Sequence, residues 1–80
     1  MSCYLIHHHH EPSECGAVYA AFKGHDTPLR QKATLASCAF GGHAIWWTVE
    51  AESETEALGL LPFYVAQRAT VTKVREVSIP

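Results

Sequence analysis

Four consecutive histidines, His7 to His10, are the part of the sequence best suited to chemistry, within a total of 6 histidines in 80 residues. Alternate side chains of a β-strand project to the same side about 7 Å apart, close enough for two imidazoles to reach one ion. Neutral imidazole is a good ligand for Zn, Ni or Cu. The run offers two pairs, His7 with His9 and His8 with His10. We favour His8 and His10, which share a face with the bulkier apolar side chains of that segment.

Two more side chains are candidates to complete a metal site with three protein ligands. His25 lies in a predicted loop, and Glu50 ends a predicted strand. We expect the strands at 3–9 and 43–50 to lie side by side and to run parallel, so that their ends meet at one corner with His25 close by. The predicted metal ligands are therefore His8 and His10, with His25 or Glu50 as the third. The competing interpretation is a solvent-facing strand end that binds metal only adventitiously. An added affinity tag is disfavoured, because the run has four members and lies inside the chain.

The three cysteines, Cys3, Cys15 and Cys38, are an odd number without CxxC spacing. They indicate neither a disulfide framework nor a zinc knuckle, and we expect reduced thiols. Cys38 and His43 lie on a cross-strand diagonal of a predicted hairpin, where a thiolate–imidazole pair is possible. The central, apolar place of Cys38 favours an inert buried cysteine instead. Cys15 is predicted to be core, with a ligand role left open by its closeness to the histidine-rich end.

An aromatic pair is the candidate for a substrate pocket. Trp47 and Tyr64 are placed between the second helix and the sheet, with the indole available for stacking and the hydroxyl for donation. Ordinary core packing is the competing interpretation of both. Glu54 and Glu56 are better explained by helix capping than by acid–base catalysis. No phosphate-binding glycine loop or Ser-His-Asp arrangement is visible.

Length and composition limit the class of protein. Eighty residues allow one domain, residues 1–80, and the 48 % hydrophobic and 18 % charged content is typical of a globular chain. The formal net charge of -2 does not supply the positive field that nucleic acid or an anionic membrane requires. No apolar run approaches the roughly 18 residues of a spanning helix, and the N-terminus lacks the pattern of a signal peptide. We therefore expect a cytoplasmic protein.

The helices and strands that must position these residues are predicted from the periodicity of apolar side chains and from the proline and glycine residues that end such elements. Cys3–His9 suits a strand, and Glu11–Glu14 suits a helix start. The helix that follows carries an apolar stripe and ends at Gly24. The stripe consists of Cys15, Val18, Tyr19 and Phe22.

A hairpin and a second helix complete the pattern. Strands at 32–40 and 43–50 are joined by Gly41-Gly42, with Ala36 opposite Trp47. Ser53 to Glu56 matches a capping box, and Pro62 breaks or kinks the helix it starts. The last strand is predicted from about Thr70 to Ile79.

The order of elements is β-α-β-β-α-β, which is typical of the ferredoxin-like class of α+β proteins. We expect a four-stranded antiparallel sheet with two helices on one face. The strands at 3–9 and 43–50 occupy the centre of this sheet. The opposite face still carries Leu35 and Trp46, which need cover. The sequence therefore predicts a homodimer in which two sheets pack face to face.

Three segments carry a resemblance that extends over nearly the whole chain. They are Ser37-Cys38-Ala39-Phe40-Gly41-Gly42-His43 with Ile45-Trp46-Trp47, Leu60-Leu61-Pro62-Phe63-Tyr64-Val65, and the ending Val77-Ser78-Ile79-Pro80. The chain resembles short bacterial ferredoxin-like proteins of unknown function in the dimeric α/β-barrel group. That wider group includes small metal-binding proteins, cofactor-independent oxygenases and lactone isomerases. The resemblance implies the fold and the dimer, but transfers no catalytic residue.

The sequence thus favours a small protein that binds a divalent transition metal, Ni, Zn or Cu, through its histidine-rich strand end, as a sensor, buffer or carrier. Two alternatives remain. One is a small dimeric-barrel enzyme, an oxygenase or isomerase, with a histidine as acid–base and a small-molecule ligand held by Trp47 and Tyr64. The other is an assembly module without chemistry.

Overall fold

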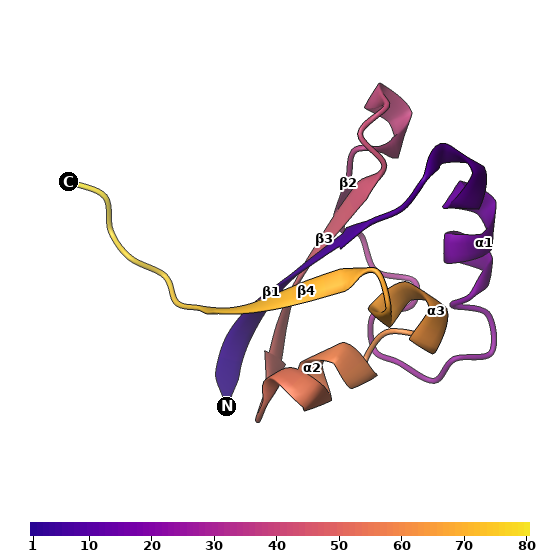
Figure 1. Cartoon of the computed structure of the whole chain (residues 1–80). Helices are drawn as coiled ribbons and strands as arrows, with labels where there is room; N and C mark the ends of the chain where they lie inside the picture. The colour runs from indigo at the N-terminus through magenta and orange to yellow at the C-terminus, as the bar shows by residue number, and fades with distance from the viewer.

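One antiparallel sheet and three short α-helices make up the protein (Figure 1). The computed structural model describes residues 1–80. The sheet has the order β2-β3-β1-β4, with strands β1 (Ser2–His9), β2 (Leu35–Ala36), β3 (Ala44–Ala51) and β4 (Ala69–Val74). The α-helices are α1 (Cys15–Ala20), α2 (Glu54–Gly59) and α3 (Phe63–Ala66), and two 3₁₀ turns are η1 (Pro12–Glu14) and η2 (Cys38–Phe40). The predicted α+β class with a four-stranded antiparallel sheet is confirmed.

The two central strands, β1 and β3, are antiparallel, so the prediction that they run parallel is wrong. Ser2 lies opposite Ala51, and His9 lies opposite Ala44. The reason is the connection: the chain returns through α1 to β2, and the β2–β3 hairpin then lays β3 between β2 and β1 in the reverse direction. The histidine-rich end of β1 therefore meets the start of β3 and the hairpin tip. Glu50, opposite Cys3, lies at the other end of the strand pair.

One face of the sheet packs against the helices and forms the core. Burial alternates along β1, where Tyr4, Ile6 and His8 are buried and their neighbours Leu5, His7 and His9 are exposed. On β3 the alternate residues Ile45, Trp47 and Val49 face the same way. The helices add the buried side chains Val18, Ala57 and Val65, and the connection between α2 and α3 adds Leu61. The face that His8 shares with the bulky apolar side chains of β1 is thus the one turned to the helices.

The helix starts follow the predicted signals. Pro12 opens η1, and the Glu14 carboxylate accepts the Glu11 N–H at 3.0 Å. Ser53 caps α2 by accepting the Glu56 N–H at 3.1 Å. Pro62 separates α2 from α3, because a proline nitrogen has no hydrogen to continue the helical pattern.

The hairpin is wider than the predicted Gly-Gly turn. β2 has 2 residues, Ala36 lies opposite Ile45, and Cys38–Phe40 forms η2 instead of a strand. Ser37 closes the turn: its N–H donates to the Ala44 carbonyl at 2.8 Å, and its Oγ accepts the Ala44 N–H at 3.0 Å. These bonds replace a longer strand ladder, because they satisfy the backbone groups locally.

The C-terminal segment differs as well. The predicted last strand reaches Ile79, whereas β4 ends at Val74 and residues 75–80 form an extended tail that leaves the body of the protein (Figure 1). Every side chain of this tail is exposed. No helix is both long and apolar enough to cross a membrane.

Candidate metal centre

Two histidines and two cysteines converge at the end of the sheet where β1 stops and β3 starts. Each of them offers one ligand atom, and the four atoms all lie within 4.8 Å of one another. We call this group the His2Cys2 cluster; its members are His10, Cys15, Cys38 and His43. His10 is buried and the other three are partly buried. The donor set is the Cys₂His₂ set of structural zinc sites.

Four different segments supply the cluster. His10 follows β1, Cys15 begins α1, Cys38 begins η2 and His43 precedes β3. The His10 N–H donates to the His43 carbonyl at 3.1 Å, which ties the end of β1 to the hairpin. Figure 1 shows the hairpin tip and α1 at the same end of the sheet. The cluster therefore depends on the tertiary fold and not on a contiguous motif.

His8 determines which nitrogen of His10 faces the cysteines. His8 Nδ1 lies 3.0 Å from the Val65 carbonyl oxygen, which can only accept, so Nδ1 of His8 carries the hydrogen. In the neutral ring Nε2 of His8 is then an acceptor, and at 3.1 Å it accepts from Nδ1 of His10. Nε2 of His10 is left with a free lone pair, 3.6 Å from Cys38 Sγ. This is the tautomer that a metal ligand needs, held by an outer hydrogen bond as in known metal sites.

Burial keeps this pair of imidazoles neutral. His8 is 0 % exposed and His10 is 2 % exposed. Burial is the largest cause that lowers the pKa of His8, and burial followed by the nearby His43 lowers the pKa of His10. Since only neutral imidazole binds metal, the low pKa values keep the ligand form available near neutral pH.

His43 is held in an unusual backbone conformation. Its φ is 50°, in the left-handed region that few residues other than glycine adopt. Its ring centroid lies 5.5 Å from that of His10, and its Nδ1 is buried without a hydrogen-bond partner. A buried ring nitrogen without a partner costs free energy, and a bound cation would satisfy it.

The hairpin tip has no room for a side chain at Gly42. A Cβ built there would lie 2.8 Å from Ser37 Cβ, closer than real contacts allow. The Gly42 N–H also donates to the Ser37 carbonyl at 3.0 Å. Gly42 thus lets the chain fold tightly over Ser37 between Cys38 and His43.

The two thiols lie beside a tyrosine. The Tyr19 hydroxyl is 3.6 Å from Cys38 Sγ, and this hydrogen bond, followed by burial, raises the pKa of Tyr19 to about 12. Burial, followed by hydrogen bonding with Cys38, raises the pKa of Cys15. Without a cation the Cys15 thiol therefore keeps its proton at neutral pH. A metal would reverse this, because a coordinating thiol is deprotonated.

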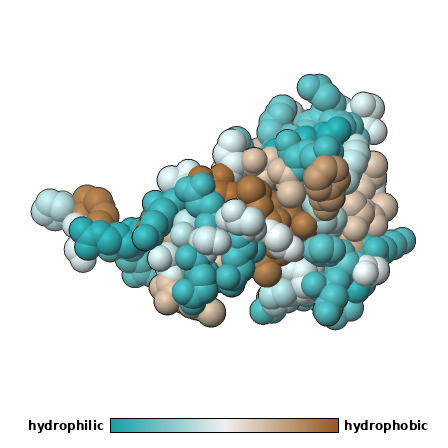
Figure 2. Space-filling view, turned by 60° about the horizontal axis from the view of Figure 1, so that its bottom comes forward, coloured by the Kyte–Doolittle hydropathy of each residue, from teal (hydrophilic) through white to brown (hydrophobic).

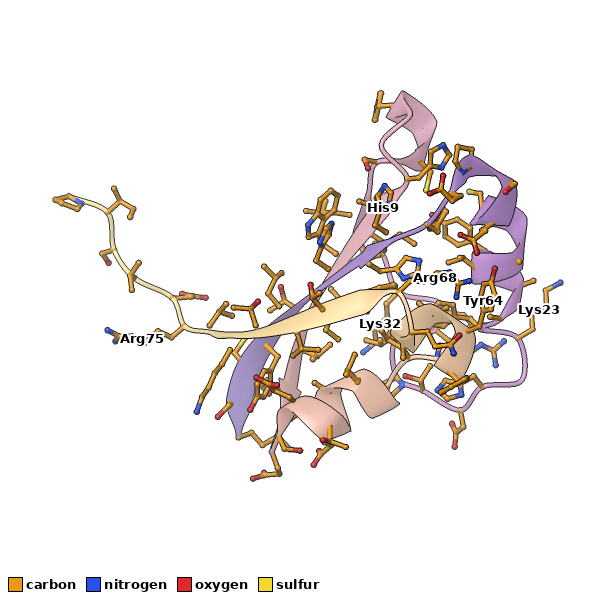
Figure 3. The ribbon with its side chains drawn as sticks, in the orientation of Figure 1. His9, Lys23, Lys32, Tyr64, Arg68 and Arg75 are labelled. Carbon is orange, nitrogen blue, oxygen red and sulfur yellow. The ribbon has the colours of Figure 1, made fainter.

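An ion pair fixes the segment that leads into Cys15. Glu14 accepts from the Tyr64 hydroxyl at 3.0 Å and pairs with Arg68 at 2.8 Å. The Arg68 guanidinium lies 4.3 Å from the centroid of the Tyr64 ring, and Figure 3 shows the two side chains side by side near α1. The hydrogen bond of Glu14 to the Glu11 backbone, then that to Tyr64, lowers the pKa of Glu14. These contacts join η1 to α3 and hold the start of α1 against the body.

The structure brings together only part of the predicted metal set. His10 belongs to the cluster and His8 is its hydrogen-bonded neighbour, whereas His25 is not among the four grouped residues. Glu50 lies opposite Cys3, about 20 Å along β1 from His9. Glu50 lies far from the histidines because β3 runs antiparallel to β1.

The predicted aromatic pocket is not assembled in the expected way. Trp47 lines two open grooves, of 820 and 310 Å³, and Tyr64 lines neither of them. Tyr64 points to Glu14 instead. Trp47 lies in the core, where Phe22 and His8 are its aromatic neighbours.

Cys15, Cys38 and His43 are the cluster members that the predicted metal set lacks. The sequence held a partial signal, because Cys38 and His43 flank one turn and Cys15 begins the helix after the histidine run. Antiparallel pairing of β1 with β3 would have joined these two observations.

Comparison with known proteins adds no name to this arrangement: no protein-family model, curated protein or solved structure matches the chain.

Proposed function

We propose that the protein binds one divalent transition metal ion, preferentially zinc, in the His2Cys2 cluster. The observation that carries the proposal is the convergence of four ligand atoms within 4.8 Å of one another. Zinc bonds of about 2.3 Å to sulfur and 2.0–2.1 Å to nitrogen place tetrahedral ligand atoms roughly 3.3–3.8 Å apart. The His10 Nε2 to Cys38 Sγ distance of 3.6 Å already falls in this range. The remaining atoms need small movements toward a common centre.

The donor set also favours a particular kind of metal. Thiolate ligands favour zinc and copper(I), whereas Mg²⁺ and Ca²⁺ require oxygen ligands. With four protein ligands, a tetrahedral ion has no position left for a substrate or an activated water. The site therefore supports holding, sensing or transferring a metal ion, as a sensor, buffer or carrier.

The test is a metal titration of the untagged protein, purified without metal-affinity resin and reduced before use. We expect one zinc ion per chain, measured by competition with a chromophoric chelator. Cobalt(II) in place of zinc should show thiolate-to-metal charge transfer and the visible bands of a tetrahedral centre. Cys38→Ser and His43→Gln should each remove stoichiometric binding.

Two variants outside the cluster serve as matched controls. Cys3→Ser removes the thiol at the other end of β1, and His9→Gln removes a histidine of the run that is exposed on the opposite face of the sheet. Both should bind zinc like the wild type. Binding that survives Cys38→Ser and His43→Gln but is lost with His9→Gln would overturn the proposal in favour of adventitious binding by the histidine run.

We further propose that the fold is ferredoxin-like and that two copies pair as a dimeric α/β barrel through the sheet face opposite the helices. On that face Leu35, paired with Trp46, is 74 % exposed, and Leu5 of β1 is 36 % exposed. Figure 2, seen from the side of α2, shows a further patch of apolar side chains near the middle of the protein and a separate apolar group in the C-terminal tail. Light scattering should give the mass of two chains, and Leu35→Lys should shift it toward one.

A further inference from the structure

Two of the three thiols lie close enough to react with each other. Cys15 Sγ and Cys38 Sγ are within 4.8 Å, while Cys3 lies opposite Glu50 at the far end of β1. A disulfide requires about 2.05 Å between the sulfurs, so the pair must close by less than about 3 Å. Both side chains are partly exposed, which leaves the sulfurs accessible to a small oxidant.

The elements that carry the two cysteines leave room for this movement. Cys15 is the first residue of α1, and apart from its chain neighbours and the backbone of α1 no atom lies within 4 Å of the place where a Cβ of Gly16 would stand. Cys38 begins η2, whose backbone hydrogen bonds to Ser37 and Gly41 are local to the turn and not part of the sheet ladder. The hairpin tip can therefore approach α1 without breaking the pairing of β1 with β3.

We propose that Cys15 and Cys38 are a reversible modification site. Hydrogen peroxide oxidises the two thiols to a disulfide, and the cluster thereby releases its metal ion. The release step rests on the proposed function, whereas formation of the disulfide in the metal-free protein does not. The protein would then hold its metal under reducing conditions and deliver it on oxidation.

The chemistry balances with the peroxide as oxidant. One sulfur attacks a peroxide oxygen, the O–O bond breaks, and a sulfenic acid and water form. The second sulfur attacks the sulfenic sulfur, the S–S bond forms, and hydroxide leaves as water after protonation. The two sulfurs lose two electrons and the peroxide gains them. In the loaded protein two protons from solvent complete the two waters, and the metal leaves as the unchanged divalent ion because disulfide sulfur is a poor ligand.

The test begins with the reduced, metal-free, full-length protein treated with a small excess of hydrogen peroxide. Non-reducing proteolysis and mass spectrometry should find a Cys15–Cys38 cross-linked peptide, a loss of two hydrogens and a free Cys3. A reductant should restore all three thiols. Cys3→Ser is the matched control and should form the same bridge, whereas Cys38→Ser should form no intramolecular bridge.

A second measurement follows the metal. Zinc-loaded protein treated with the same peroxide should release at least nine tenths of its zinc to a chromophoric chelator, and reductant should restore binding. Absence of the bridge in the metal-free protein, or bridging through Cys3, overturns this inference and leaves the metal proposal standing. A bridge in a protein that never binds zinc overturns the metal proposal and the release step, but supports the modification site. Retention of zinc by the fully bridged protein overturns the release step.

Discussion

Two substitutions of His8 separate its two hydrogen bonds. The amide of asparagine reaches the place of Nδ1 in a histidine ring, whereas the amide of glutamine reaches that of Nε2. His8→Asn should therefore keep the donor to the Val65 carbonyl and lose the acceptor for His10. His8→Gln should keep the acceptor for His10 Nδ1 and lose the donor to Val65.

The two variants should differ in stability and still more in metal affinity. His8→Asn leaves the buried Nδ1–H of His10 unpaired, at a cost of about 1–3 kcal/mol in the free energy of unfolding. His8→Gln should cost less, because the Val65 carbonyl still accepts the Arg68 N–H at 3.1 Å. Only His8→Asn frees the His10 ring to change its tautomer and orientation. Loss of an outer hydrogen bond of this kind typically weakens metal binding about 10–100-fold. We expect a loss of that size for His8→Asn and less than about a threefold change for His8→Gln.

Urea unfolding of the metal-free proteins measures the first quantity, and chelator competition at fixed pH measures the second. His9→Gln, on the exposed face, is the control for changing a histidine of the run without touching the core. Equal weakening of zinc binding in both His8 variants would show that His8 acts by packing alone. Unchanged affinity in His8→Asn would refute the hydrogen-bond argument itself.

Three more predictions follow from the same geometry. Because the pKa values of His8 and His10 are lowered in the folded state, the unfolded chain binds more protons than the folded one as the pH falls. The free energy of unfolding of the metal-free protein should therefore be highest above the unfolded pKa of about 6.5 and fall as the pH drops through the folded pKa values. Urea titrations should show this with a slope of at most about 2.7 kcal/mol per pH unit for two protons, and a flat profile from pH 7.5 to 5 would contradict it. Gly42→Ala should destabilise the protein by about 1–3 kcal/mol and weaken zinc binding, because the new Cβ meets Ser37. Gly16→Ala, where a Cβ has open space, should do neither. Equal melting temperatures for the two variants would contradict this prediction. The double variant His8→Leu with His10→Leu should abolish zinc binding. The metal-free protein should stay at least as stable as the wild type, because both partners of a buried hydrogen-bonded pair are replaced by apolar groups. A loss of more than about 3 kcal/mol in the free energy of unfolding in urea would count against this prediction.

The periodicity of apolar residues was sufficient to predict which face of each strand packs against the helices, because this periodicity reflects the burial of each residue within its own strand. The alternation of Tyr4, Ile6 and His8, and that of Ile45 with Trp47, placed the inward faces of β1 and β3 as the structure has them. The capping signal at Ser53 was equally local.

The site was harder to predict, because it depends on strand direction and on a turn. Taking β1 and β3 as parallel drew Glu50 toward the histidines and kept Cys38 and His43 away from them. The wide turn closed by Ser37 also shifted the hairpin pairing, which no dipeptide signal at Gly41-Gly42 indicated. A reversal of one strand leaves every inward face unchanged and exchanges the two ends, so faces were predictable while the grouping of ligands was not.

The burial of His8 and His10 is the step that joins fold to function. Apolar side chains in these two places would fill the same core without hydrogen-bond requirements, so the imidazoles do not serve stability. Two of their four ring nitrogens, Nε2 of His8 and Nδ1 of His10, bond to each other, and Nδ1 of His8 donates to the Val65 carbonyl. The fourth, Nε2 of His10, is turned to Cys38. A core that served packing alone would gain nothing from orienting a lone pair toward a thiol. Binding a cation supplies a reason for both the buried relay and the direction in which it ends.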